Sequence, residues 1–165
     1  MRLLGIDPGS RHCGWGVVER QGSKVTALAW GRWSPRADLP LPARLAELAR
    51  GLRDVLAAHS PERAAVERVF HGVSARSLIV LAEARGAILS ELAGAGLEVA
   101  ELTPAEVKSA VAGSGRADKQ QVERMVRLQL GLADEGLSAD AADALAVALA
   151  EALRAKFDRG SQTRS

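Results

Sequence analysis

In three segments, carboxylates occupy positions where burial of their charge would cost free energy. Two of these segments lie near opposite ends of the chain, and a third lies between them. Asp7 follows a short apolar run and precedes a Pro-Gly pair, and Glu67 ends another short apolar run. Asp140 and Asp143 lie near the start of an alanine-rich segment. Acidic side chains at the ends of buried elements need positive charge beside them. The fold must therefore gather these acids around a common counter-charge or keep each of them in water.

The composition is that of an ordinary globular protein. The 165 residues are 47% hydrophobic and 25% charged, which suffices for one domain with a sizeable core. No apolar run reaches the length that crosses a membrane, and the N-terminus lacks the pattern of a signal peptide. The lone Cys13 cannot form an internal disulfide. We therefore expect a cytoplasmic protein without membrane contact, in which Cys13 is a small buried residue.

The formal net charge of +2 gains meaning if the acids gather at one site. The chain has 22 Lys and Arg residues and 20 Asp and Glu residues. Setting four acids aside leaves 16 acids against 22 bases on the rest of the surface. Such an excess of positive charge suits a polyanionic partner.

Strand and helix signals follow one another in the order βββαβαβααα. The predicted strands are Arg2–Ile6, Gly14–Glu19, Lys24–Trp33, Ala64–Glu67 and Leu97–Ala100. The predicted helices are Ser74–Ala93, Asp118–Leu130 and Ser138–Lys156, with two more that begin near Leu41 and at a capping box that starts at Thr103. We expect an α/β fold with a five-stranded mixed sheet flanked by helices. One domain over residues 1–157 would be followed by a flexible polar tail over residues 158–165.

Strand alternation and helical spacing can bring the four acids together. Asp7 lies at the carboxyl end of the first strand, where α/β folds bind ligands, and Glu67 lies at the same end of a neighbouring strand. Asp140 and Asp143 are three residues apart and share one face of the last helix. If that helix crosses the strand ends, the acids form a site of hard oxygen ligands. Such a site suits two Mg²⁺ ions, or Mn²⁺ in their place, and the chemistry expected of the bound ions is phosphodiester hydrolysis.

Each acid also has a simpler interpretation. Asp140 and Asp143 would stabilise a helix N-terminus by about 0.3–1 kcal/mol through the helix dipole. Asp7 could be a turn residue before Pro-Gly, and Glu67 could be a solvated strand end. The metal-site hypothesis is favoured because three such coincidences in one chain are rarer than any one of them.

The segments around these acids resemble motifs of the RuvC family of Holliday junction resolvases, in the family's order and spacing across nearly the whole chain. The motifs are Gly5–Arg11, Gly14–Gly16, Val66–Phe70, Glu83–Gly86, Val107–Lys108 and Asp140–Ala146. The resemblance implies an RNase H-like fold, a homodimer, and a Mg²⁺-dependent endonuclease that makes paired symmetrical nicks in four-way DNA junctions during recombination and repair. It also implies the RuvA–RuvB branch-migration complex as a partner.

The resemblance assigns roles by position. The residues that match the family's metal-binding catalytic acids are Asp7, Glu67, Asp140 and Asp143. Phe70 matches an aromatic residue at the junction crossover, and Lys108 and Lys119 match basic residues of the DNA-binding face. We add Arg76 and Arg116 to the DNA-binding set. Phe70 could instead be a core residue, and the lysines could be solvated.

The chain departs from the family at positions near the predicted crossover. Arg68 stands where Gln is frequent after the catalytic Glu, Val73-Ser74 replaces a common Lys-Asn pair, and Glu83 stands where Gln is usual. These departures concern DNA contact and sequence preference, and they leave the four acids untouched.

Two other function classes remain open at this stage. ATPases and sugar kinases also use an Asp-x-Gly turn after a first strand, but the chain is short for their two lobes and has no second glycine-rich loop. A junction-binding protein without catalysis would not need all four acids. A further expectation concerns the helix Ser74–Ala93, whose stretch Leu78–Leu81 is apolar on every side. We expect this helix to form the dimer interface, with burial within the monomer as the alternative.

Overall fold

The structure, a computed structural model, describes residues 1–9, 11–68, 74–133 and 136–161, with side chains as far as Ala155. The strands of this part of the chain are β1 (Arg2–Asp7), β2 (Cys13–Gln21), β3 (Lys24–Trp33), β4 (Arg63–Glu67) and β5 (Glu98–Leu102). The helices are α1 (Leu41–His59), α2 (Ala75–Gly94), α3 (Pro104–Ala112), α4 (Lys119–Leu130) and α5 (Ala139–Ser161). The predicted order βββαβαβααα is confirmed.

The strands form one mixed sheet in the order β3-β2-β1-β4-β5. β1, β2 and β3 are antiparallel neighbours, whereas β4 and β5 run parallel to β1. The pairing of β1 with β4 places Ile6 opposite Val66. The residues that follow, Asp7 and Glu67, therefore leave the sheet at the same edge. The predicted mixed sheet is confirmed.

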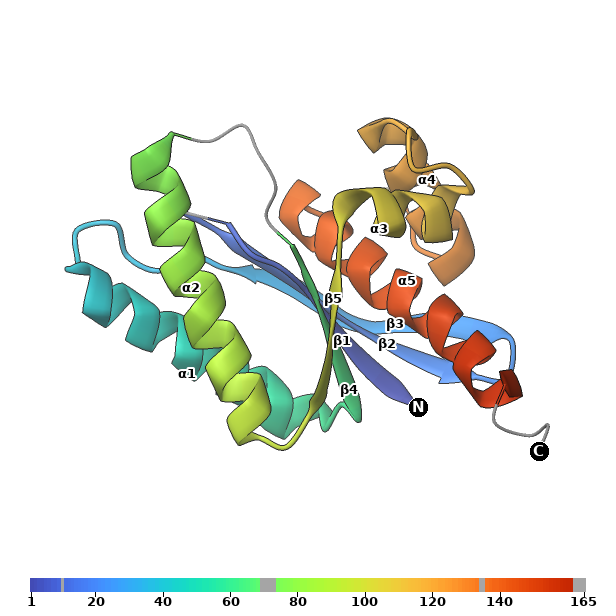
Figure 1. The fold of residues 1–165 in the computed structure, drawn as a ribbon, viewed down its shortest axis with the longest axis horizontal. Coiled ribbons are helices and arrows are strands. Elements are labelled where there is room, and N and C mark those ends of the chain that lie inside the picture. Colours follow the sequence, from blue (N-terminus) through green and yellow to red (C-terminus); the bar gives the residue numbers. More distant parts are fainter. Residues whose placement is uncertain (10, 69–73, 134–135, 162–165) are drawn as a thin grey trace.

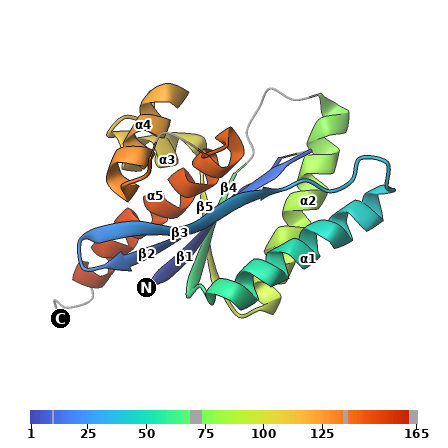
Figure 2. The same ribbon diagram turned by 180° about the vertical axis from the view of Figure 1, so that it is seen from behind.

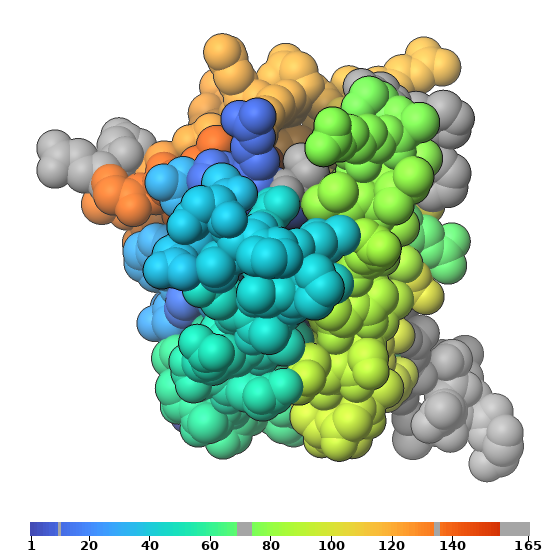
Figure 3. All heavy atoms as spheres, turned by 90° about the vertical axis from the view of Figure 1, so that its left-hand side faces the viewer, coloured from blue at the N-terminus to red at the C-terminus, as the bar shows by residue number. Residues whose placement is uncertain are grey.

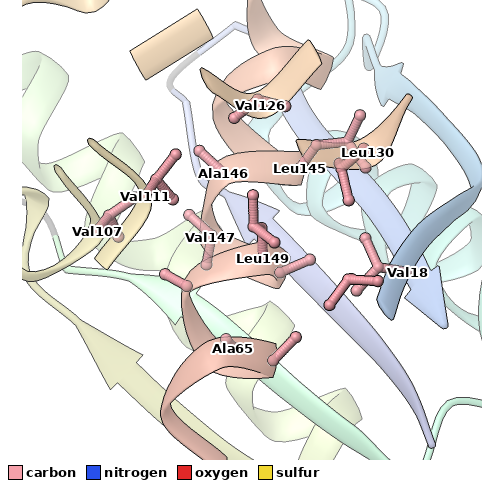
Figure 4. Packing of buried hydrophobic residues seen from close by; sticks show 14 of the residues in the cluster. Val18, Ala65, Val107, Val111, Val126, Leu130, Leu145, Ala146, Val147 and Leu149 are labelled. Carbon is pink, nitrogen blue, oxygen red and sulfur yellow. The ribbon is translucent and has the colours of Figure 1, made fainter. Parts of the chain in front are cut away.

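Helices cover both faces of the sheet (Figures 1 and 2). α1 and α2 pack on one face over a core that includes Leu4, Ile6 and Val66, and the two helices form the side of the molecule seen in Figure 3. α3, α4 and α5 pack on the other face over a core that includes Leu3 and Ala65 (Figure 4). Alternate residues of β1 and β4 thus belong to different cores, as the period of a strand requires.

α5 lies directly on the backbone of β1 and β2 because these strands carry glycine where the helix crosses them. A Cβ atom at Gly5 would lie 2.3 Å from the carbonyl oxygen of Ala144, and a Cβ atom at Gly14 would lie 2.0 Å from the carbonyl oxygen of Asp140. Both distances are far below van der Waals contact, so a side chain at either position would push the helix off the sheet. The two glycines therefore set how closely the acids of α5 approach the strand ends.

The far half of α5 is fixed by polar contacts with the sheet. Glu151 is 3% exposed and is the buried charged residue of the described part of the chain. Its Oε1 lies 3.3 Å from Nη2 of Arg63 on β4. Nη1 of Arg20 on β2 donates to the carbonyl oxygen of Ala152 at 3.0 Å. A buried ion pair is costly to break, so these contacts hold the register of α5 along the sheet.

The predicted helix bounds agree with the structure to within one residue except at the end of the last helix. Thr103 and Glu106 form the capping box of α3, as predicted. The predicted end of the last helix at Lys156 is wrong, because α5 continues to Ser161. No Pro stops it, and the single Gly160 costs a helix only about 1 kcal/mol. Positions 158–161 of the predicted tail are therefore helical, and residues 162–165 lie outside the described part. None of the described helices is long and apolar enough to span a membrane.

Candidate metal-binding catalytic site

Asp7 and Glu67 meet at the edge where β1 and β4 end, and their side chains share a hydrogen bond. Burial, followed by the negative charges of Glu67 and Asp143, raises the pKa of Asp7 from 3.8 to about 8. Burial also raises the pKa of Glu67, whereas the hydrogen bond with Asp7 opposes this rise. At neutral pH the Asp7 carboxyl therefore keeps its proton and donates it to the Glu67 carboxylate.

The start of α5 presents Asp140 and Asp143 to the same edge. The hydroxyl oxygen of Ser138 accepts a hydrogen bond from the backbone N–H of Ala141 at 3.3 Å, which stabilises the first turn. The two acids are three residues apart and share a helix face. The negative charges of both raise the pKa of Asp7, so both lie within electrostatic reach of the buried pair. The structure thus places all four predicted acids at one edge of the sheet.

Two basic side chains from different elements face the acids of α5. Nζ of Lys119, the first residue of α4, donates to Oδ2 of Asp143 at 2.6 Å. Nη1 of Arg32, near the end of β3, lies 3.6 Å from Oδ2 of Asp140. Half or more of each basic side chain is exposed. Ion pairs this exposed contribute at most about 1 kcal/mol, so either base can exchange its carboxylate for another anion.

An open pocket of about 200 Å³ adjoins the acids on the side of α3 and α4. Its lining includes Glu67, Lys108, Lys119 and Asp143. The positive charge of Lys108 lowers the pKa of Glu67, so this lysine acts on the acidic pair from across the pocket. A pocket that combines acids with bases suits a phosphate that must be held beside cations.

The remaining predicted DNA-binding residues are more dispersed. Arg116 is exposed just before α4 begins, and Arg76 is exposed in the first turn of α2, in the layer on the other face of the sheet. Phe70 lies outside the described residues. Arg32 was not predicted to belong to the site. In the sequence it is simply one of the basic residues within a predicted strand. Its closeness to Asp140 follows from the pairing of Arg32 with Gly14, which the sequence alone does not reveal.

The donor atoms of the site fit a hard divalent ion, although the acids are held by other partners. Cys13 is buried, and burial raises the pKa of its thiol, which leaves carboxylate oxygens as the ligands at this edge. Among the described residues, no three His, Cys, Asp or Glu side chains already stand where they could hold a metal ion. Lys119 and Arg32 hold the acids of α5 instead. Burial and the neighbouring carboxylates raise the pKa of Asp7, and a bound cation would lower it again.

A mixed sheet of this order, with carboxylates at the ends of β1 and β4 and on a crossing helix, defines an RNase H-like domain with an acidic nuclease site. The sequence model of the family described as crossover junction endodeoxyribonuclease RuvC matches residues 3–151. The chain belongs to this family, as its motifs predicted.

Relatives and solved structures agree with this assignment. The crossover junction endodeoxyribonuclease RuvC of Anaeromyxobacter sp. (strain Fw109-5) is 49% identical over 154 residues, which cover 93% of this chain and 74% of the relative. The protein of the same name from Chloroflexus aggregans is 47% identical over 155 residues and 94% of each chain. The structure of Thermus thermophilus RuvC in complex with Holliday junction substrate matches with a TM-score of 0.90 at 35% identity, over 96% of both chains. The predicted RNase H-like fold is confirmed.

Proposed function

We propose that the chain is a metal-dependent endonuclease that resolves four-way DNA junctions by paired symmetrical nicks in recombination and repair. The observation that carries this proposal is the gathering of four acids at one edge of the sheet, beside a pocket lined by Lys108 and Lys119. Family membership supports the reaction. The T. thermophilus relative, described with a Holliday junction substrate, supports the substrate class.

The metal that we propose is Mg²⁺, with two ions in each site and Mn²⁺ as a substitute. The side chains that would hold them are Asp7, Glu67, Asp140 and Asp143. When bound, the ions supply an activated water nucleophile and stabilise the leaving oxygen of a phosphodiester. Carboxylate oxygens are the ligands that these hard ions prefer. For Asp7 to serve as a ligand, the proton that it shares with Glu67 must leave.

The basic side chains of the site would hold the phosphate. The hydrogen bond to Asp143 raises the pKa of Lys119, and the side chain is exposed enough to turn from Asp143 to a DNA phosphate. Lys108 adds positive charge from the α3 wall of the pocket. Charge fixed on both sides of a phosphate supports its orientation before hydrolysis.

Paired nicking requires two active sites at a fixed separation, so we propose a homodimer. Support comes from α2, where Leu78 is 45% and Ile79 is 60% exposed while Leu81 is buried. Neighbouring large apolar side chains in water mark an interaction surface. We further propose the RuvA–RuvB branch-migration complex as a partner and the cytoplasm as the place of action, since both fit a member of the RuvC family.

A nicking assay on a synthetic four-way junction tests the proposed function. The wild-type protein should cut two opposing strands at symmetrical positions when Mg²⁺ is present and leave a linear duplex of the same sequence intact. Asp7→Asn should bind the junction normally and lose cleavage by orders of magnitude. The matched control is Asp54→Asn, which removes an exposed acid of α1 and should cleave like the wild type. Normal cleavage by Asp7→Asn would refute the metal site, and ATP turnover without nicking would favour the kinase-like alternative.

A further inference from the structure

Arg32 of β3 approaches the four acids from the side opposite the pocket that Lys108 and Lys119 line. β4, which ends in Glu67, lies on one side of β1, whereas β3 lies on the other side beyond β2. Arg32 of β3 is 3.6 Å from Asp140, and its side chain is 51% exposed. The acids are therefore bordered by Arg32 on one side and by Lys119 on the other. A strand of DNA that crosses the acids would meet positive charge where it enters and where it leaves.

The register of β3 shows which way its side chains point. Arg32 is paired with Gly14, and Trp30 is paired with Gly16. A Cβ atom at Gly14 would run into Asp140 of α5, and a Cβ atom at Gly16 would run into the side chain of Leu145, also of α5. Directly paired residues of antiparallel strands point to the same face. Trp30 and Arg32 therefore both lie on the α5 face of the sheet, two residues and about 7 Å apart.

Trp30 differs from the other two tryptophans of the chain. Trp15 and Trp33 stack with their ring centroids 6.0 Å apart and pack against the core beneath α1 and α2. Trp30 stands on the edge strand of the sheet and is 37% exposed. A large aromatic side chain that is partly in water beside an exposed arginine is a typical contact for a nucleic-acid strand. The position next to Asp140 connects this pair of side chains to the acidic site.

We propose that Trp30 and Arg32 form a DNA subsite on β3, which holds the strand on the side of the active site away from Lys108. Arg32 contacts a backbone phosphate, and Trp30 packs against the adjoining nucleotide. This inference rests on the proposed junction cleavage and adds to it a second contact surface. The weak pairing of Arg32 with Asp140 suits such a role, because the guanidinium can transfer to a phosphate at little cost.

Tryptophan fluorescence tests the subsite without reference to cleavage. The chain has three Trp and no Tyr residues, so its emission comes from the stacked pair and from Trp30. Junction DNA added in EDTA should quench the emission of the wild-type protein, because a nucleotide would cover Trp30. The same quench should be absent from Trp30→Phe, which keeps an aromatic ring in place for folding. A quench of wild-type size in Trp30→Phe would overturn the role of Trp30.

Binding measurements test the two residues separately. Trp30→Ala should weaken junction binding about tenfold, within the range found for aromatic residues that stack on nucleotides. Arg32→Ala should flatten the dependence of log affinity on log salt by about one unit, the effect of one lost phosphate contact. The matched controls are Leu128→Ala, an apolar residue of α4 that is 73% exposed, and Arg50→Ala, an exposed arginine of α1. Both controls should bind like the wild-type protein.

The outcomes separate this inference from the proposed function. If the wild-type protein fails to nick the junction, the proposed function fails. If the wild-type protein nicks and the Trp30 and Arg32 variants bind with unchanged affinity and salt slope, the subsite alone is refuted. An unchanged slope of log affinity against log salt in Arg32→Ala, combined with a lower Mg²⁺ requirement for cleavage, would show that Arg32 is only a counter-ion of Asp140.

Normal DNA binding by Trp30→Ala would contradict the proposal. The exposed side of β3 would then be left as a surface for a protein partner.

Discussion

Nζ of Lys119 lies 2.6 Å from Oδ2 of Asp143, so the first residue of α4 holds an acid near the start of α5. This contact joins a predicted DNA-binding residue to a predicted metal ligand. Lys108 lines the same pocket from α3, where its charge acts on Glu67. The two lysines therefore share a pocket and differ in whether they hold an acid directly.

Replacement of either lysine should weaken junction binding through lost phosphate contact. Lys108→Ala and Lys119→Ala should each reduce the slope of log affinity against log salt by about one unit. Lys119→Ala should also cleave slowly at saturating protein, because the base that turns from Asp143 to orient the phosphate is lost. Titrations at several salt concentrations and single-turnover cleavage measure the two effects. Unchanged salt slopes in both variants would mean that the two lysines contact water and make no contact with a DNA phosphate.

The proton kept by Asp7 predicts how stability depends on pH in the absence of divalent ions. The pKa rises from 3.8 to about 8 on folding, so the folded protein binds this proton more tightly than the unfolded chain. The proton on Asp7 therefore stabilises the folded protein. This stabilisation is complete below pH 3.8 and is lost as the pH rises through about 8. At pH 8, Asp7→Asn should exceed the wild-type free energy of unfolding by at least about 1.4 kcal/mol, the equivalent of one pKa unit.

Urea unfolding in EDTA from pH 5 to pH 8.5 measures this difference. Asp54→Asn, in which the substituted acid is exposed on α1, should keep the pH dependence of the wild-type protein. Saturating Mg²⁺ should reduce the difference between Asp7→Asn and the wild type, because the ion stabilises the folded form of the protein that retains its ligand. Equal slopes for the two proteins in EDTA would contradict the raised pKa.

The sequence predicted the elements that carry the acids because their signals are local. The apolar run before Asp7 and the Pro-Gly pair after it define the end of β1, and the capping box at Thr103 defines the start of α3. The parallel alignment of β4 with β1, which brings Glu67 to Asp7, followed from the strand order. Family motifs then gave the four acids their roles.

The part of the site contributed by β3 was not predictable, because it depends on register. The register of β2 and β3 shifts between Val17 and Val18, so simple alternation from Lys24 would assign Arg32 to the wrong face. Sequence spacing likewise does not show that Gly5 and Gly14 lie beneath α5. Contacts between elements far apart in the chain decide these features, and local signals do not encode them.

The glycines beneath α5 predict a link between packing and activity. Gly5→Ala would place a methyl group 2.3 Å from a carbonyl oxygen of α5 and should lower the free energy of unfolding by about 1–3 kcal/mol. The helix would have to move away from β1, so cleavage should fall even where the variant remains folded. Gly94→Ala, at a helical position with open space around it, should change stability by less than about 1 kcal/mol and leave cleavage intact. Thermal unfolding and the nicking assay measure both, and a Gly5→Ala protein with normal stability and activity would show that α5 can shift freely.

The exposed apolar turn of α2 predicts the position of the dimer interface. Ile79 is 60% exposed within the monomer, so Ile79→Asp should fold normally. In an apolar interface the unpaired carboxylate would cost several kcal/mol, which shifts the monomer–dimer equilibrium by orders of magnitude. Sedimentation should show a monomer, and the nicks in the two strands of a junction should become independent events. Leu128→Asp, which alters an even more exposed residue on α4, should remain dimeric. A folded Ile79→Asp protein that sediments as a dimer would place the interface on another surface.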